Sequence, residues 1–88
     1  MTISFPNESR WFDPARRVVR FWGSDSAIEC DFSVTADALE NLGTNPVSDE
    51  HGILNIFDSN REQIITAASK IYRRGQRGSY ELTSDHLR

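Results

Sequence analysis

Four cations lie close together in the last third of the chain, where they could bind phosphate or an acidic partner. They are Lys70, Arg73, Arg74 and Arg77. Arginine is suited to bidentate pairing with either group. A structural role is the alternative, because cations at a helix C-terminus stabilise the helix through its dipole and its last carbonyls. The binding hypothesis gains weight if Arg16 and Arg17 fold onto the same side.

Residues for catalysis, metal binding or cofactor binding do not form a set in this sequence. The only histidines are His51 and His86, and neither stands beside a nucleophile that it could activate. The consecutive residues 49–51 are Asp, Glu and His, but neighbouring side chains on a helix point about 100° apart and do not converge on one ion. Residues 75–78 follow a helix end and do not open one, so they are not a phosphate loop. We expect no catalytic residue, no metal ligand and no cofactor.

A second candidate surface lies on one strand of a predicted hairpin. Val18, Arg20 and Trp22 share one phase of the strand and should point away from the helices. Tryptophan beside arginine is typical of the centre of a protein interface. Either the segment around Trp11 and Phe12, or the N-terminal segment, covers Trp22 within the monomer, or the open face predicts a homodimer or a partner surface.

The hairpin itself spans residues 17–34 and alternates strictly on both sides of the sequence Gly23-Ser24-Asp25-Ser26. Val19 and Phe21 fall on one face of the first strand. A four-residue loop would place Phe21 opposite Ile28, Val19 opposite Cys30 and Arg20 opposite Glu29. Cys30, the single cysteine, then packs inward as a small hydrophobe.

Helices follow the hairpin. Thr35 can cap a short helix over residues 36–42, which Gly43 ends. Ser48 can cap a longer helix over residues 49–74, whose apolar positions follow a helical period. Residues 58–60 are weak helix formers and Ser59 with Glu62 has capping-box spacing, so a kink is conceivable there, but we favour one nearly continuous helix.

The ends of the chain complete the sheet. Residues 1–14 contain a short extended start over 3–5 and a loop over 7–14 that carries Trp11 and Phe12. Residues 78–83 alternate, with Tyr80 and Leu82 on one face, and form a last strand. We expect the tail, residues 84–88, to fray.

Composition fits one soluble domain. The 88 residues carry a formal net charge of −3, and nine of the ten basic residues are arginine. Acids gather between positions 29 and 62, with eight acids against one arginine. The acidic balance argues against a general nucleic-acid coat. No apolar run is long enough to span a membrane and no signal sequence is present, so the expected location is the cytoplasm.

Short segments in a fixed order suggest a family. They include Ser9-Arg10-Trp11-Phe12-Asp13, Val19-Arg20-Phe21-Trp22-Gly23, Phe32-Ser33-Val34-Thr35 and Tyr80-Glu81-Leu82. With them the chain resembles the short bacterial proteins catalogued as domain of unknown function number fourteen-eighty-eight. The resemblance implies a free-standing bacterial α+β protein and supplies no catalytic or binding residue.

The sequence thus predicts a single α+β domain over residues 1–88, with elements in the order β-β-β-α-α-β. A small antiparallel sheet of three or four strands is covered on one face by a short helix and a long helix. The predicted core is Phe5, Val19, Phe21, Ile28, Cys30, Phe32, Val34, Leu39, Leu42, Ile53, Phe57, Ile64, Ala68, Ile71 and Leu82.

For function, the favoured hypothesis is a non-enzymatic cytoplasmic interaction module that binds a protein partner or itself. The first alternative is a small nucleic-acid-associated regulator that uses the arginines. The second is a small-molecule-binding protein or an enzyme that uses carboxylates such as Asp13 or Asp58.

Overall fold

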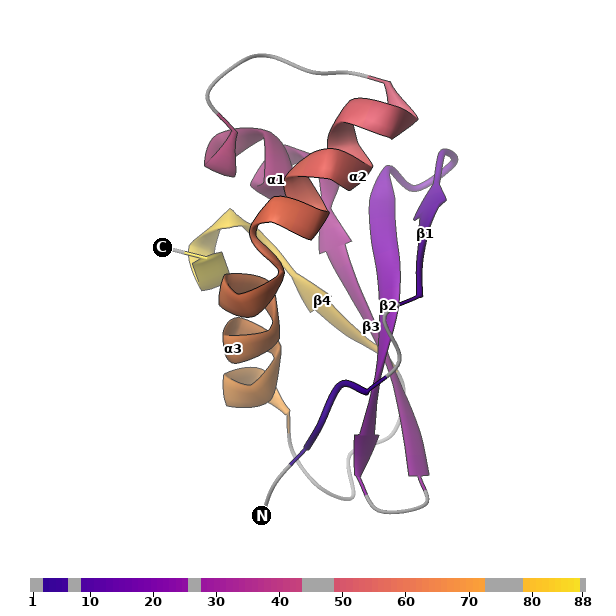
Figure 1. The fold of residues 1–88 in the computed structure, drawn as a ribbon, viewed down its shortest axis with the longest axis vertical. Helices are drawn as coiled ribbons and strands as arrows, with labels where there is room; N and C mark the ends of the chain where they lie inside the picture. The colour runs from indigo at the N-terminus through magenta and orange to yellow at the C-terminus, as the bar shows by residue number, and fades with distance from the viewer. Residues whose placement is uncertain (1–2, 7–8, 26–27, 44–48, 73–78, 88) are drawn as a thin grey trace.

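The structure, a computed structural model, describes residues 3–6, 9–25, 28–43, 49–72 and 79–87. Its elements follow in the order β1 (Arg10–Asp13), β2 (Val18–Asp25), β3 (Ile28–Thr35), α1 (Ala36–Leu42), α2 (Glu50–Ser59), α3 (Arg61–Ile71), β4 (Tyr80–Leu82) and a short 3-10 helix, η1 (Ser84–Leu87). The strands form one sheet, and the helices lie together on one side of it (Figure 1). The predicted α+β class and the order of strands and helices are confirmed.

Strand directions in the sheet differ from the prediction at its last member. β1 pairs with β2 and β2 with β3 in antiparallel fashion, but β4 runs parallel to β3. A parallel neighbour requires a long crossover connection, and α1, α2 and α3 provide it here. The sheet is therefore mixed and not wholly antiparallel.

The hairpin has the predicted faces but a different register. Phe21 lies opposite Phe32 and Val19 opposite Val34, so the predicted pairings with Ile28 and Cys30 are wrong. β2 continues through the segment that we expected to be loop, as far as Asp25. The opposing positions shift by four residues, and an even shift keeps every side chain on its face. The longer pairing also stacks Phe21 on Phe32, with ring centroids 5.5 Å apart.

The exposure of Ile28 is a consequence of that register. This residue leaves the predicted core and has 63% of its surface exposed. Ile28 begins β3 at the turn end of the hairpin, and this end of the hairpin extends past the last turn of α3 (Figure 1). Cys30, two positions further in, is partly buried and packs against the core.

The N-terminal part contributes more to the sheet than predicted. Residues 10–13, expected to lie in a loop, form β1 beside β2. The expected extended start makes a single bridge in which the backbones of Ser4 and Ser24 exchange hydrogen bonds of 2.9 and 2.7 Å. Phe5 follows it and packs on the core aromatics Phe21 and Phe32.

Helix α1 has the predicted bounds. Thr35 Oγ1 accepts a hydrogen bond from the backbone N–H of Ala38 at 3.1 Å, as expected of an N-cap. Gly43 ends the helix, with an ordinary negative φ of −80°.

The long helix is two helices, so the prediction of one continuous helix is wrong. The break falls at Asn60, whose side-chain amide donates to the carbonyl of Ile56 at 2.9 Å and competes with the helical pattern. α2 and α3 then run in different directions (Figure 1). Asp49 caps α2 through the N–H of Gly52 at 2.9 Å; the predicted cap, Ser48, lies outside the described residues.

The core lies between the inner face of the sheet and the helices. Its fully buried members include Val19, Phe21, Phe32, Val34, Leu39, Ile53, Phe57, Ile64, Ala68 and Leu82, all of them predicted. Phe5, Leu42 and Ile71 are partly buried against it. None of the helices within the described ranges has the length and apolar character of a membrane span.

The tail is ordered up to Leu87, contrary to the prediction. Residues 84–87 form η1, and Leu87 keeps only 5% of its surface exposed. The side-chain amide of Gln63 on α3 donates to the carbonyl of Leu87 at 2.8 Å, which fixes the tail against the helix.

Candidate functional site

One row of polar and aromatic side chains crosses the whole sheet on the face turned away from the helices. Trp11 on β1 lies opposite Arg20 on β2, Arg20 opposite Ser33 on β3, and Ser33 opposite Glu81 on β4. Directly paired residues project to the same face of a sheet. We call this the outer row. The row results from the alternation of side chains along each strand, because the residues directly before and after each member point to the opposite face.

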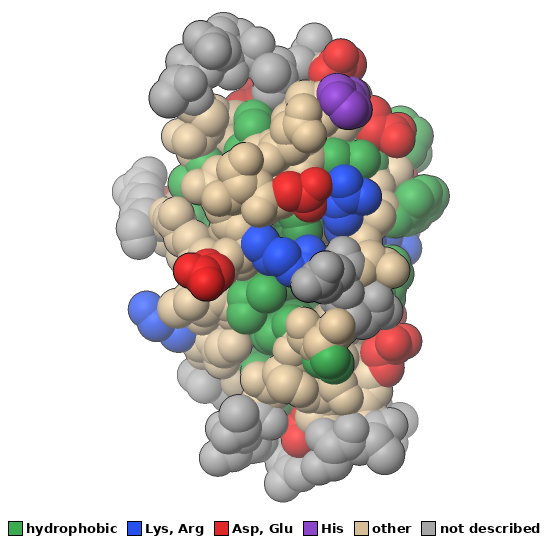
Figure 2. All heavy atoms as spheres, viewed as in Figure 1, with side chains coloured by type: hydrophobic (Ala, Val, Ile, Leu, Met, Phe, Trp, Pro, Cys, Tyr) green, Lys and Arg blue, Asp and Glu red, His purple; other side chains and the backbone are tan. Residues whose placement is uncertain are grey.

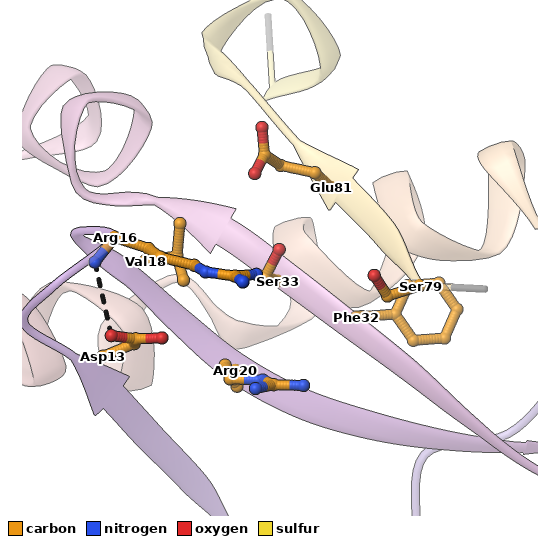
Figure 3. A pocket seen from close by; sticks show the side chains of 8 residues that line it. All are labelled: Asp13, Arg16, Val18, Arg20, Phe32, Ser33, Ser79 and Glu81. Atoms are coloured by element: carbon orange, nitrogen blue, oxygen red, sulfur yellow. Dashed lines mark hydrogen bonds between the residues drawn. The ribbon is translucent and has the colours of Figure 1, made fainter.

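A fifth side chain, that of Arg16, reaches this face from the β1–β2 turn. Asp13 Oδ1 accepts hydrogen bonds from the backbone N–H groups of Ala15 at 3.0 Å and Arg16 at 3.3 Å. Asp13 therefore shapes the turn that presents Arg16. The Arg16 side chain lies along the sheet over Val18, with its guanidinium beside Ser33 (Figure 3). This placement explains why Val18, predicted to face outward, keeps only 5% of its surface exposed.

These residues line a small pocket of about 70 Å³. Its walls are Asp13, Arg16, Val18, Arg20, Phe32, Ser33, Ser79 and Glu81. The guanidiniums of Arg16 and Arg20 extend in the same direction, and Glu81 rises from β4 on the far side of Ser33 (Figure 3). The pocket thus has two cations and two hydroxyl groups on its wall, with a carboxylate at either end.

Arg16 and Arg20 have no ion pair with a described carboxylate, whereas the other described arginines have ion-pair or ring contacts. Arg10 pairs with Asp58 and Arg17 with Glu40, and Arg61 lies over the ring of Phe57 at 5.5 Å from its centroid. Among the described residues, no carboxylate lies within ion-pair distance of the Arg16 or Arg20 guanidinium. Their bonding capacity is available to a ligand.

The structure describes only Lys70 of the predicted cation cluster. Arg73, Arg74 and Arg77 lie outside the described residues. Lys70 is exposed on α3, in a shallow hollow with Glu62 and His86, whereas Arg16 lies on the other side of the sheet. The structure does not bring Lys70 and Arg16 together.

Arg17, also predicted for the anion site, has a structural role. Its guanidinium pairs with Glu40 on α1 at 3.1 Å, and its carbonyl accepts the N–H of Ala36 at 2.8 Å. It also adopts a positive φ of 55°, which lets the turn reverse. Arg17 therefore anchors the turn to α1, and its neighbour Arg16 faces the pocket.

The predicted interface set is partly retained on this face. Arg20 and Trp22 are partly exposed, whereas Val18 is buried. Trp11 does not lie over Trp22; it stands on β1 opposite Arg20 and keeps 53% of its surface exposed. An exposed tryptophan beside the pocket is the apolar part of this surface.

The carboxylates considered for catalysis have structural partners. Asp58 accepts two hydrogen bonds of 2.9 Å from Arg10, and that interaction holds the pKa of Asp58 below its ordinary value. A general acid at neutral pH needs a raised pKa instead. Asp13 holds its turn, as described above. Within the described ranges, no group of three His, Cys, Asp or Glu side chains could hold a metal ion.

Sequence reasoning missed one buried polar contact. The Tyr72 hydroxyl, at the end of α3, donates to Asp25 Oδ2 at 2.5 Å, and both residues are buried. The hydrogen bond to Asp25, with desolvation and the neighbouring Cys30, raises the pKa of Tyr72. The contact joins the far end of the hairpin to the helix layer. Only the three-dimensional register reveals it, because the two residues are 47 positions apart.

Together these features define a class: a two-layer α+β protein with a mixed sheet, one face of which bears no helix in the described part. The family model for "Protein of unknown function (DUF1488)" matches residues 3–83, so the chain belongs to the DUF1488 family. The expected resemblance is confirmed.

A solved structure has the same fold. It is the crystal structure of a protein of unknown function from the DUF1488 family of Shewanella loihica PV-4. The similarity has a TM-score of 0.78 at 19% sequence identity, and covers 93% of this chain and 94% of that chain. No curated protein matches the chain.

Proposed function

We propose that this protein is a non-enzymatic interaction module of the bacterial cytoplasm, and that it binds a protein partner through the outer row and the adjoining pocket. The observation that carries the proposal is the difference between the two faces of the sheet. The inner face is occupied by the core. The outer face presents Trp11 together with Arg16 and Arg20, whose charges the described chain leaves unpaired.

Residue types support this choice. Tryptophan and arginine are the side chains most enriched where interfaces carry their binding energy. Arg20 lies directly opposite Trp11, so both groups can contact one partner at once. Catalysis has less support, because Asp13 and Asp58 are engaged in the fold. A pocket of about 70 Å³ is also far smaller than the usual small-molecule site.

Nucleic acid is the less favoured partner. The outer face also carries Glu29, Asp31 and Glu81, all exposed, and they would repel a row of phosphates. Over the helices, the described side chains of both charge signs are intermixed and form no continuous basic patch (Figure 2). A protein partner held by one aromatic and two cationic groups suits this mixed surface better.

Capture of the tagged protein from a lysate of its own source cell tests the proposal. Wild type is compared with Trp11→Ser and with the double variant Arg16→Ala/Arg20→Ala. The control is Lys70→Ala, which also removes a positive charge but lies on α3, in the helix layer. Each capture is done with and without nuclease. A protein retained after nuclease by wild type and Lys70→Ala, but lost with Trp11→Ser, supports the module.

Other results of the same experiment contradict it. Retention that disappears with nuclease and falls steeply with salt would identify a nucleic-acid-binding protein instead. Retention equal in all variants would remove the outer face from the function. Recovery of a second copy of this chain alone, with loss in Trp11→Ser, would overturn the choice of a different protein as partner and would make the module a homodimer.

A further inference from the structure

We propose that the Arg16–Arg20 pocket binds a single carboxylate supplied by an acidic side chain of the protein partner. The inference rests on the proposed interaction function and specifies its chemistry. It begins with the two guanidiniums, which extend in the same direction over one pocket and have no carboxylate partner within the described residues (Figure 3). Two planar guanidinium groups on one pocket can both donate hydrogen bonds to a single oxyanion.

The pocket limits the ligand to one functional group. Its volume of about 70 Å³ leaves no room for a nucleotide or a cofactor. The hydroxyls of Ser33 and Ser79 line it together with the arginines and can donate further hydrogen bonds. A side-chain carboxylate on a partner satisfies these donors, and the rest of the partner stays outside.

The charges around the pocket select the kind of oxyanion. Asp13 and Glu81 also line it, so two carboxylates face whatever enters. Two cations and two carboxylates leave the lining with no net charge, so the second negative charge of phosphate gains little Coulomb energy there. The doubly charged ion still costs more to remove from water, and the singly charged carboxylate is therefore the favoured ligand.

Trp11 supplies the neighbouring contact. It lies opposite Arg20 in the outer row and is more than half exposed. An apolar residue next to the acidic residue of the partner would pack on this ring while the carboxylate enters the pocket. The pocket and the row therefore predict a partner segment in which an acidic residue has a large apolar neighbour.

The test uses the full chain and two acetylated, amidated peptides that differ only at one position, Leu-Glu-Leu against Leu-Gln-Leu. Binding is followed by NMR through the Nε–H signals of Arg16 and Arg20 and the amide of Ser33. We expect the glutamate peptide to move these signals. Loss of either arginine should weaken it at least about tenfold, the size of one charge-assisted hydrogen bond. Lys70→Ala should leave the affinity unchanged.

One further variant and two small anions test whether the pocket prefers a carboxylate. Arg20→Lys keeps the charge but loses the planar fork, so we expect weaker binding in a protein whose folding is intact by circular dichroism. Inorganic phosphate and acetate are titrated in parallel. Tighter binding of phosphate than of acetate would overturn the carboxylate assignment. Equal shifts with both peptides, or none with either, would overturn the site.

The inference and the proposed function fail separately. If Trp11→Ser abolishes capture of a protein partner while the double arginine variant retains it fully, the module stands and the carboxylate pocket is refuted. If the glutamate peptide binds as expected and no partner is captured by wild type, the preference of the pocket for a carboxylate stands, and the protein partner that would supply it is refuted.

Discussion

Arg10 on β1 and Asp58 near the end of α2 form two parallel hydrogen bonds of 2.9 Å across 48 residues of sequence. The pair ties the edge strand of the sheet to the helix layer. β1 is short and lies at the end of the strand order, beside β2. The salt bridge adds a further anchor, on the face of the strand opposite Trp11, to the pairing with β2 and the burial of Phe12.

Replacing Asp58 by Asn should destabilise the protein modestly. Both side chains are one third or more exposed, at 34% and 45%, so solvent screens the pair. We expect a coupling of about 0.5–1 kcal/mol. A double-mutant cycle with Arg10→Ala, measured by urea unfolding, provides the value. Additive effects of the two substitutions would contradict a direct interaction.

The same pair should make stability depend on pH in acid. Arg10 lowers the pKa of Asp58 below its ordinary 3.8. A lowered pKa stabilises the fold above the unfolded-state value and this contribution is lost as pH falls through the folded-state value. Wild type should thus lose stability relative to Asp58→Asn below about pH 4. Parallel curves for the two proteins across that range would refute the linkage.

Arg17 offers a test of backbone strain. Its φ of 55° lies in the left-handed region, where glycine is favoured. Arg17→Ala and Arg17→Gly both lose the pair with Glu40, so their difference reports the backbone alone. We expect the glycine variant to be more stable by about 0.5–1 kcal/mol, since relief of strain outweighs the added freedom of the unfolded chain. Equal urea midpoints would show an unstrained turn.

Gly23 should resist enlargement. A Cβ there would lie 2.7 Å from Cε2 of Phe5 and 2.9 Å from Cδ1 of Ile3. Gly23→Ala should push the N-terminal segment off the sheet, at a cost of about 1–3 kcal/mol. Faster hydrogen exchange at the Ser24 amide, which donates to Ser4, would report the displacement. Adding Phe5→Leu should recover part of the loss; no recovery would contradict the proposed clash.

Tyr72 should make stability fall in alkali. Its hydrogen bond to Asp25 raises the pKa of the phenol from 10.0. A raised pKa stabilises the fold fully below the unfolded-state value, and this stabilisation is lost as pH rises above it. Wild type should lose stability above about pH 10 more steeply than Tyr72→Phe. Thermal unfolding across that range compares the slopes, and identical slopes would exclude the contribution.

The fold could be predicted from the sequence as far as local patterns determine it. Alternation assigned Val19, Phe21, Phe32 and Val34 to one face, and the cap and the terminal glycine set the bounds of α1. The register escaped prediction because an even shift leaves the faces unchanged. β1 escaped because its four residues alternate too briefly, and its anchor, Asp58, is remote in sequence.

The site was visible only in parts. Arg16 was assigned to an anion cluster and Arg20 to an interface, from local charge and phase. Their common pocket depends on the turn that Asp13 and Arg17 form and on the pairing of four strands. Glu81 could not be placed beside them from the sequence, because the direction of β4 is decided by the crossover and not by its own residues.

That crossover has a consequence for the order of folding. Strands β1 to β3 pair with sequence neighbours, so they can form a meander early, whereas Phe32 must wait for Tyr80, which lies 48 positions later. Synthesis from the N-terminus strengthens this order. In that meander β3 is still an edge strand, and the pocket beside Arg16 and Arg20 lacks the wall that Ser79 and Glu81 supply until β4 pairs with β3. Completion of the pocket thus reports that the last strand has joined the sheet.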